Sequence, residues 1–237
     1  MLDECYSVNS SVALSTVFLV LFFACSAVHV VGEFLEDPKK QRVHFASKPF
    51  LMPLLIVYYY TSAIEAGFNV NVLIAFGVAL GFVGDVSLLW PKKQAFFIVG
   101  LFAFLLGHVL YVVAFISAMN AFSTVPWWFY FTAIGFMGYF YVSFRLFRPY
   151  LKEMLVPVAV YLTLLLTMSF IALAVVVSAT VGNVRQPWYL FLGSLSFIAS
   201  DSLLANQIFR KPFKYDQAII MITYILAQFF IVQAYLG

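Results

Sequence analysis

Long apolar segments separated by short polar ones make up almost the whole chain. A helix needs about 20 mainly apolar residues to span a bilayer, and the clusters of charged residues and prolines divide the sequence into eight segments of about that length. These segments are Ser11–Val31, Pro49–Gly67, Val70–Trp90, Ala95–Ala118, Pro126–Leu146, Glu153–Ser178, Pro187–Phe209 and Tyr215–Leu236. The pattern therefore predicts eight transmembrane helices.

Prolines and tryptophans agree with these boundaries. Pro49, Pro126 and Pro187 fall at or near predicted helix starts, where the missing N–H costs least. The tryptophans fall at segment ends, as expected for side chains that favour the membrane interface; they are Trp90, Trp127, Trp128 and Trp188.

The composition leads to the same class of protein. Of the 237 residues, 64% are hydrophobic and only 10% are charged, so the chain has too little polar surface to remain in water. Its polar segments are too short for a separate soluble domain. We expect an all-α, polytopic membrane helix bundle in which residues 1–237 form a single integral membrane domain.

The basic residues predict the orientation. All of the 13 lysines and arginines except Arg185 fall in the first, third, fifth and seventh predicted loops or, for Arg145, at the helix end beside the fifth. By the positive-inside rule these loops are cytoplasmic and both termini are non-cytoplasmic. The net charge of +3 is therefore a signal of topology, and we expect no nucleic-acid partner. The membrane would be the inner or plasma membrane in a prokaryote and the endoplasmic reticulum in a eukaryote; nothing fixes an oligomeric state.

Two aspartates interrupt the apolar segments. Asp85 lies in Gly77–Trp90 (GVALGFVGDVSLLW) and Asp201 in Phe197–Ala205 (FIASDSLLA). A charge at the centre of a membrane helix costs about 2.5–3.5 kcal/mol on insertion scales, so such acids are candidate functional groups. The alternative is that each acid bonds a neighbouring Ser or Tyr and locks helices together.

The two motifs suggest an internal repeat. They lie four predicted helices apart, and the same offset places His108 over Tyr224. A parallel repeat of four plus four helices would account for both matches.

Other polar side chains in the apolar segments are candidate binding residues. His108 could transfer protons or bind a ligand, with Tyr111 one turn further on the same face; the alternative is an ordinary buried histidine. Tyr224 and Gln228 are spaced i, i+4 and need hydrogen bonds if they face inward. Lys48 could contact a lipid phosphate, or it could extend its side chain to the membrane surface and only set the topology.

The sequence contains no recognisable metal or nucleotide motif. It has no HExxH, no Cys–His cluster and no glycine-rich phosphate loop, and His29, His44 and His108 are scattered along it. We therefore expect no metal and no cofactor.

Five short motifs, taken in order, resemble the YhhN-like lysoplasmalogenase family from the second predicted helix to the eighth. They are Ser47-Lys48-Pro49, Gly84–Trp90 (GDVSLLW), Gly107-His108 with Tyr111, Ser200–Ala205 (SDSLLA), and Tyr224 with Ala227-Gln228. One departure is Asn206, which lies one position earlier than in the family pattern.

The resemblance implies an eight-helix membrane enzyme that hydrolyses the vinyl ether bond of lysoplasmalogens. The products would be a fatty aldehyde and a glycerophosphocholine or glycerophosphoethanolamine, and Asp85 and Asp201 match the family's catalytic pair. Its partners would be a lysophospholipid substrate and membrane lipid.

The chemistry suits two carboxyl groups. A vinyl ether hydrolyses when its β-carbon is protonated and water traps the resulting oxocarbenium ion, so one carboxyl must act as an acid and the other as a base. Tyr111, Tyr224 and His108 would orient the aspartates or the water, and the headgroup would lie near Lys48, Lys92 or Lys93.

Two other readings of the aspartates remain open. An intramembrane aspartyl protease needs GxGD, but this chain has Gly81-Phe82-Val83-Gly84-Asp85 and no Pro-Ala-Leu motif. A proton-coupled transporter also uses acids inside the membrane, but the predicted helices lack Gly and Pro breaks in matching positions.

Overall fold

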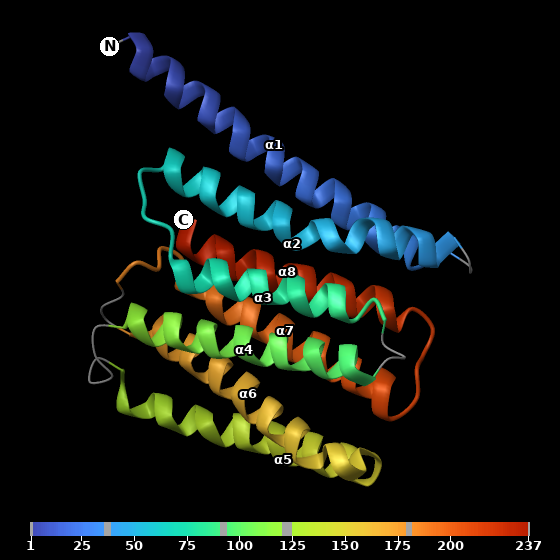
Figure 1. Ribbon diagram of the computed structural model, residues 1–237. Coiled ribbons are helices and arrows are strands. Elements are labelled where there is room, and N and C mark those ends of the chain that lie inside the picture. Colours follow the sequence, from blue (N-terminus) through green and yellow to red (C-terminus); the bar gives the residue numbers. More distant parts are fainter. Residues whose placement is uncertain (1, 36–38, 91–93, 120–124, 179–181, 237) are drawn as a thin grey trace. The chain divides into compact units, whose positions relative to one another are not determined.

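The fold is built from helices, as expected. The structure is a computed structural model that describes residues 2–35, 39–90, 94–119, 125–178 and 182–236, and 87% of it is helical. The α-helices in these residues are α1 Leu2–Gly32, α2 Lys39–Glu65, α3 Val72–Ser87, α4 Gln94–Ala118, α5 Thr132–Leu151, α6 Leu155–Val177, α7 Pro187–Phe209 and α8 Asp216–Leu236 (Figure 1). The short 3₁₀ helices η2 (Trp127–Phe131) and η3 (Lys152–Met154) precede α5 and α6.

The predicted start of α2 is wrong. The helix begins at Lys39, and Pro49 and Pro53 lie inside it. Its polar first turns are held against the end of α1, where Glu33 Oε1 lies 2.6 Å from His44 Nδ1. Prolines inside a membrane helix are tolerated where neighbouring helices and Ser or Thr side chains compensate for the lost backbone bonds. The contact with α1 therefore extends α2 beyond the point at which its prolines suggested a boundary.

Helix α3 is shorter than predicted. Its 16 residues rise roughly 24 Å, which is less than the roughly 30 Å of a hydrocarbon core. The side chain of Asn71 fixes the start by accepting hydrogen bonds from the amides of Leu73 (3.0 Å) and Ile74 (3.4 Å). Tyr59 of α2 in turn accepts a hydrogen bond from the Asn71 amide at 3.0 Å, so α3 begins at a point set by α2.

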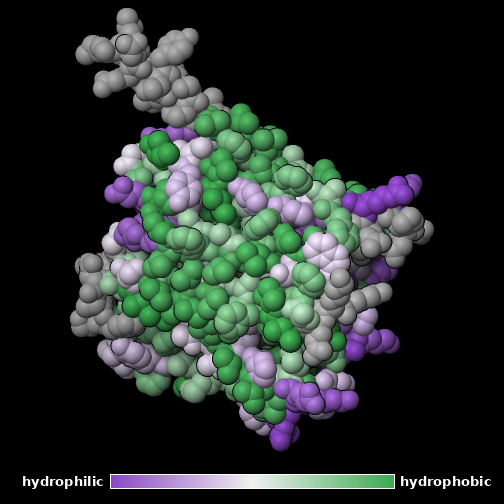
Figure 2. Space-filling view, in the orientation of Figure 1, coloured by the Kyte–Doolittle hydropathy of each residue, from purple (hydrophilic) through white to green (hydrophobic). Residues whose placement is uncertain are grey.

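Hydrophobic side chains cover much of the surface. By length and composition, five helical stretches could cross a membrane: Leu14–Gly32, Ala95–Ala118, Trp127–Val177, Pro187–Phe209 and Asp216–Leu236. Figure 2 shows hydrophobic residues over most of the face it displays. Exposed positions of this kind occur on several helices and include Val20, Phe102, Val142, Val156 and Ile222. Such a surface is typical of a protein that contacts lipid.

The chain divides into two compact units. The first is Met1–Leu110 with Leu236, and the second is Tyr111–Tyr235 with Gly237, so the boundary lies within α4. In the first unit α1 runs along α2 and α2 packs on α3 (Figure 1). In the second unit α6 packs on α7, and α5 packs on both.

Glycines let α3 and the first part of α4 approach closely. A Cβ at Gly107 would lie 3.3 Å from the carbonyl oxygen of Gly77, and one at Gly100 would lie 3.4 Å from that of Gly84. Gly84 itself faces the ring of Phe104. Small residues therefore allow a close helix contact at Gly77 and Gly84 of α3.

Replacing Gly84 with alanine should destabilise the protein. The added Cβ would lie 2.6 Å from the Phe104 ring, so the ring has to move, and overpacking of this kind costs about 1–3 kcal/mol. The melting temperature in detergent should fall. Gly138→Ala is the matched control, because a Cβ there has nothing within 4 Å and alanine favours a helix over glycine. Equal melting temperatures for the two variants would contradict the close contact.

Candidate functional site

Asp85 forms a buried ion pair with Lys48. The carboxylate lies near the end of α3 and is 2% exposed, and Lys48, on α2, is 4% exposed. Lys48 Nζ lies 3.5 Å from Asp85 Oδ1. Removing two charges from water is costly unless they face each other and their remaining bonds are satisfied. The pair therefore ties α2 to α3 at the first of the two acidic motifs.

The expected surface position of Lys48 is wrong. The sequence predicted that Lys48 lies just before the start of a helix, where its side chain could extend to the membrane surface or contact a lipid phosphate. Because α2 begins at Lys39, Lys48 lies well inside the helix. From there its ammonium group is directed at Asp85 instead.

His108 lies in the same unit and is also buried. Its Nδ1 is 2.7 Å from the backbone oxygen of Phe104, one turn earlier in α4. A carbonyl oxygen only accepts hydrogen bonds, so Nδ1 is the donor and carries a proton. The ring of Phe104 also contacts Gly84, the residue before Asp85. His108 is thereby connected to the Asp85 motif through Phe104.

Asp201 has a different environment. It is half-buried on α7, and Tyr161 of α6 donates a hydrogen bond to its Oδ2 at 2.7 Å. In the next residue, Ser202 Oγ lies 2.6 Å from Tyr139 Oη of α5. Helices α5, α6 and α7 are thus joined by hydrogen bonds around the second acidic motif.

Neither tyrosine was predicted from the sequence. Tyr161 is one of few side chains in α6 that can form hydrogen bonds, since most of that helix is aliphatic. This scarcity is a signal that could have identified Tyr161. Tyr139 offers no such signal, because α5 also contains Tyr141 and Tyr150.

Three predicted binding residues come together in the second unit. Tyr111 Oη donates to Gln228 Oε1 at 2.5 Å, and Gln228 Nε2 donates to Tyr224 Oη at 3.4 Å. The ring of Phe197 lies 6.2 Å from that of Tyr111 and 6.0 Å from that of Tyr224, centroid to centroid. The i, i+4 pair of Tyr224 and Gln228 predicted from the sequence is confirmed, and Tyr111 is its third member.

The two aspartates differ in the groups beside them. Asp85 faces an ammonium group and Asp201 a phenol hydroxyl group. An ammonium group is the natural partner of a carboxylate, whereas a hydroxyl group can also donate to the carbonyl oxygen of a protonated carboxyl group. The arrangement therefore allows one acid to be ionised and the other neutral.

Two of the histidines that are scattered along the sequence lie close together in the structure. The rings of His29 and His44 lie 5.2 Å apart, centroid to centroid, and Glu33 is close to both. They come together because α1 and α2 run side by side. These are the described residues that could hold a metal ion. Lys92 and Lys93, the other predicted headgroup contacts, lie outside the described residues.

A sequence model of the YhhN family matches residues 43–235. This chain belongs to the YhhN family. Among curated proteins it is similar to Lysoplasmalogenase TMEM86B of Homo sapiens, with 29% identity over 195 residues that cover 82% of this chain and 76% of that protein. No solved structure matches the chain. The resemblance inferred from the five motifs is confirmed at the level of the family.

Removing the charge of Lys48 should destabilise the protein, and removing both charges should restore much of the loss. Lys48→Met takes the ammonium group away from a buried carboxylate, a change that typically costs about 3–5 kcal/mol. The double variant Lys48→Met/Asp85→Asn has no such buried charge. Melting temperatures in detergent measure both effects, and Lys211→Met, at an exposed lysine, is the control. A double variant no more stable than Lys48→Met would contradict the ion pair.

Proposed function

We propose that this protein hydrolyses the vinyl ether bond of lysoplasmalogens and releases a fatty aldehyde and a glycerophospho-base. The observation that carries the proposal is membership of the YhhN family, together with similarity to a protein named lysoplasmalogenase. The matched region, residues 43–235, contains both aspartates and every predicted substrate-binding residue.

We propose that Asp201 is the general acid. Tyr161 donates to its Oδ2, so the proton of a neutral Asp201 would be on Oδ1. From there it can be transferred to the β-carbon of the alkenyl chain. The Tyr161 hydroxyl group carries no charge and can hydrogen-bond to a protonated carboxyl group as well as to a carboxylate, which is consistent with a neutral Asp201 in the resting enzyme.

Asp85 would then be the general base. The ammonium group of Lys48 lies beside it and favours its carboxylate form. When the substrate has become an oxocarbenium ion, Asp85 would take a proton from the attacking water. Lys48 would be a positioning residue, which keeps the carboxylate of Asp85 charged and in place.

The cycle returns both groups to their starting states. Proton transfer from Asp201 to carbon leaves its carboxylate, and addition of water to the cation leaves a hemiacetal and a protonated Asp85. Asp201 then removes the hemiacetal hydroxyl proton while Asp85 protonates the departing glycerol oxygen. The C–O bond breaks, aldehyde and glycerophospho-base leave, and neither redox chemistry nor a cofactor enters this sequence.

Substrate binding is assigned to the remaining polar residues. We propose that Tyr111, Tyr224 and Gln228, which share one hydrogen-bonded cluster, orient the lipid or the attacking water, with His108 in a similar role. The substrate would be a single-chain phospholipid with a choline or ethanolamine headgroup that reaches the enzyme from the surrounding membrane lipid.

The bond that is cut can be tested with three lysophospholipids that differ only at the first glycerol carbon. Purified protein should release free aldehyde from the alkenyl compound and nothing from the alkyl ether, because a saturated ether has no carbon basic enough to protonate. Release of fatty acid from the acyl compound, or no aldehyde from the alkenyl compound, would contradict the proposal. Solute flux in proteoliposomes without aldehyde release would favour a transporter instead.

Asp85→Asn and Asp201→Asn should each reduce aldehyde release by about 100- to 10,000-fold, the usual contribution of a general acid or base. Asp201→Asn should fold, because asparagine preserves the volume of a neutral carboxyl group. Asp85→Asn leaves the ammonium group of Lys48 buried without its partner, so its activity is compared with that of Lys48→Met/Asp85→Asn, in which neither member of the pair is charged. The double variant Asp85→Asn/Asp201→Asn should be little worse than the worse single variant, since groups that act together are not additive.

Asp216→Asn is the matched control for these variants. Asp216 is also buried, but it accepts hydrogen bonds from the backbone amides of Phe213 and Gln217 at the start of α8. Its replacement should change stability and leave kcat unaltered. If Asp85→Asn or Asp201→Asn retained most of the activity, that aspartate would have only a structural role.

For the membrane arrangement we propose eight transmembrane helices, a four-plus-four parallel repeat and two non-cytoplasmic termini, in an inner or plasma membrane or the endoplasmic reticulum. The distribution of basic residues supports this orientation. Single-cysteine labels at residues 3 and 237 should react from the non-cytoplasmic side and a label at Lys92 from the cytoplasmic side. Termini that report opposite sides would contradict an even number of crossings.

A further inference from the structure

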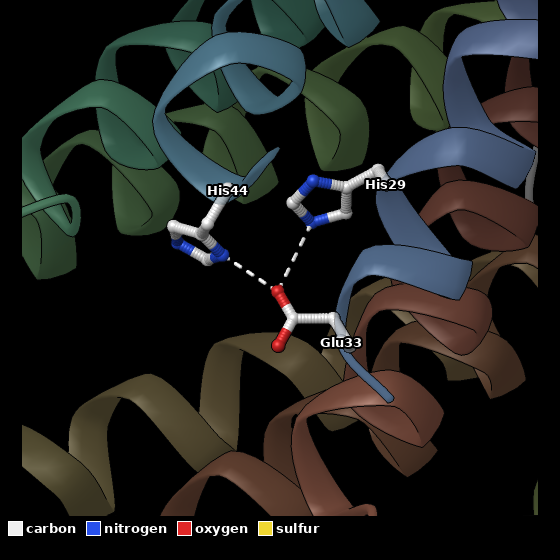
Figure 3. A group of neighbouring side chains, drawn as sticks. All are labelled: His29, Glu33 and His44. Atoms are coloured by element: carbon white, nitrogen blue, oxygen red, sulfur yellow. Dashed lines mark hydrogen bonds and ion pairs between the residues drawn. The ribbon is translucent and has the colours of Figure 1, made fainter. Parts of the chain in front are cut away.

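Three side chains at the junction of α1 and α2 point nitrogen or oxygen atoms that could bind a metal ion toward one place. They are His29 and Glu33, one turn apart at the end of α1 and just after it, and His44 near the start of α2 (Figure 3). Glu33 Oε1 lies 3.7 Å from His29 Nε2 and 2.6 Å from His44 Nδ1. One donor atom from each of the three lies within 4.8 Å of the other two.

The hydrogen bonds of Ser47 fix the proton on His29. Ser47 Oγ lies 2.6 Å from the backbone oxygen of Val43 and 2.7 Å from His29 Nδ1. The carbonyl oxygen cannot donate, so the hydroxyl proton of Ser47 is directed at Val43. His29 Nδ1 must therefore be the donor to Ser47. A neutral His29 then has its lone pair on Nε2, the atom that faces Glu33.

His29 Nε2 is in an unusual position. The side chain is 0% exposed, and Nε2 makes no hydrogen bond within the described residues. Its distance of 3.7 Å to Glu33 Oε1 exceeds that of an N–H···O hydrogen bond, about 2.7–3.2 Å. A nitrogen lone pair and a carboxylate oxygen repel each other at close range unless a cation lies between them.

We propose that His29, Glu33 and His44 bind a divalent transition metal ion of the zinc class. With bonds of about 2.0–2.2 Å, two ligands of a tetrahedral zinc ion lie roughly 3.3 Å apart. The observed separations of 3.7 and 2.6 Å lie on either side of that distance. Binding needs a small opening of the contact between Glu33 and His44, and the proton that His44 Nδ1 donates to Glu33 must move to Nε2 so that Nδ1 can bind the ion. Two imidazoles and one carboxylate leave a fourth position for water.

The donor set selects the kind of ion. Imidazole nitrogen suits zinc and its neighbours in the first transition row, whereas calcium and magnesium prefer oxygen ligands. Ser47 acts behind the site by orienting His29, as the outer partners of metal-bound histidines commonly do.

The site is distinct from the residues proposed for catalysis. His29 and Glu33 precede the region matched by the YhhN family, residues 43–235, so family membership does not assign them a function. The ion would join α1 to α2 next to Ser47, the residue before Lys48. Its expected effect is to stabilise the first unit.

The test uses purified full-length protein that has been treated with a chelator and loaded with Zn²⁺, Mg²⁺ or Ca²⁺ separately. We expect one Zn²⁺ per chain, measured by isothermal titration and by metal analysis after gel filtration, and a higher melting temperature with Zn²⁺ alone. Glu33→Gln and His29→Gln should lose binding by more than about 100-fold, and Ser47→Ala should weaken it by about 10- to 100-fold.

Glu65→Gln is the matched control. Glu65 is a partly buried glutamate on α2 that accepts hydrogen bonds from Ser15 of α1, so it makes a similar contact away from the cluster. Its replacement should leave Zn²⁺ affinity unchanged. Equal Zn²⁺ affinity in wild type and Glu33→Gln, or no stoichiometric binding in wild type, would overturn the proposal and indicate that a second proton on His29 separates the two groups.

A measurement on the wild type alone covers the case in which variants fail to fold. The X-ray absorption spectrum of the zinc-loaded protein should show two imidazole ligands and otherwise oxygen. A spectrum with sulfur ligands, or without imidazole, would overturn the site.

Discussion

The ion pair between Lys48 and Asp85 sets the position of α3 against α2, and the neighbouring contacts follow from that position. A charged pair that is almost fully removed from water must keep its geometry, because separating the charges would leave each one buried alone. Gly84 precedes Asp85 and has room only for a hydrogen toward Phe104. The backbone of Phe104 in turn holds His108. The cost of burying this ion pair therefore favours a single arrangement of α2, α3 and the first part of α4.

The second aspartate shows how one residue type can take a different chemical role. Asp201 contacts a tyrosine hydroxyl group and is less deeply buried than Asp85. A carboxyl group beside a neutral donor can keep its proton, and one beside an ammonium group has a reason to lose it. The groups beside the two aspartates, Lys48 and Tyr161, therefore decide which aspartate is proposed as the base and which as the acid. Two aspartates in equivalent surroundings could not be assigned different roles in this way.

Much of the helical architecture could be predicted from the sequence, because a membrane helix is determined mainly by its length of apolar residues. The bounds of α7 were predicted as observed, and those of α4 and α8 within one residue. The start of α2 could not be predicted, since it depends on a contact with α1 that overrides the local effect of Pro49. Residues that share a helix, such as Tyr224 and Gln228, could be paired by spacing. Pairs on different helices, such as Lys48 with Asp85 or His29 with His44, depend on packing that the sequence alone does not contain.

Carbon protonation is the central claim, and the isotope content of the product tests it most directly. If the enzyme is run on alkenyl lysophospholipid in deuterium oxide, the released aldehyde should carry one deuterium on the carbon next to the carbonyl group, and turnover should be slower than in ordinary water. Mass spectrometry of the aldehyde, collected before enolisation exchanges that position, measures the label. Aldehyde released by the wild type without deuterium would contradict the roles proposed for Asp201 and Asp85.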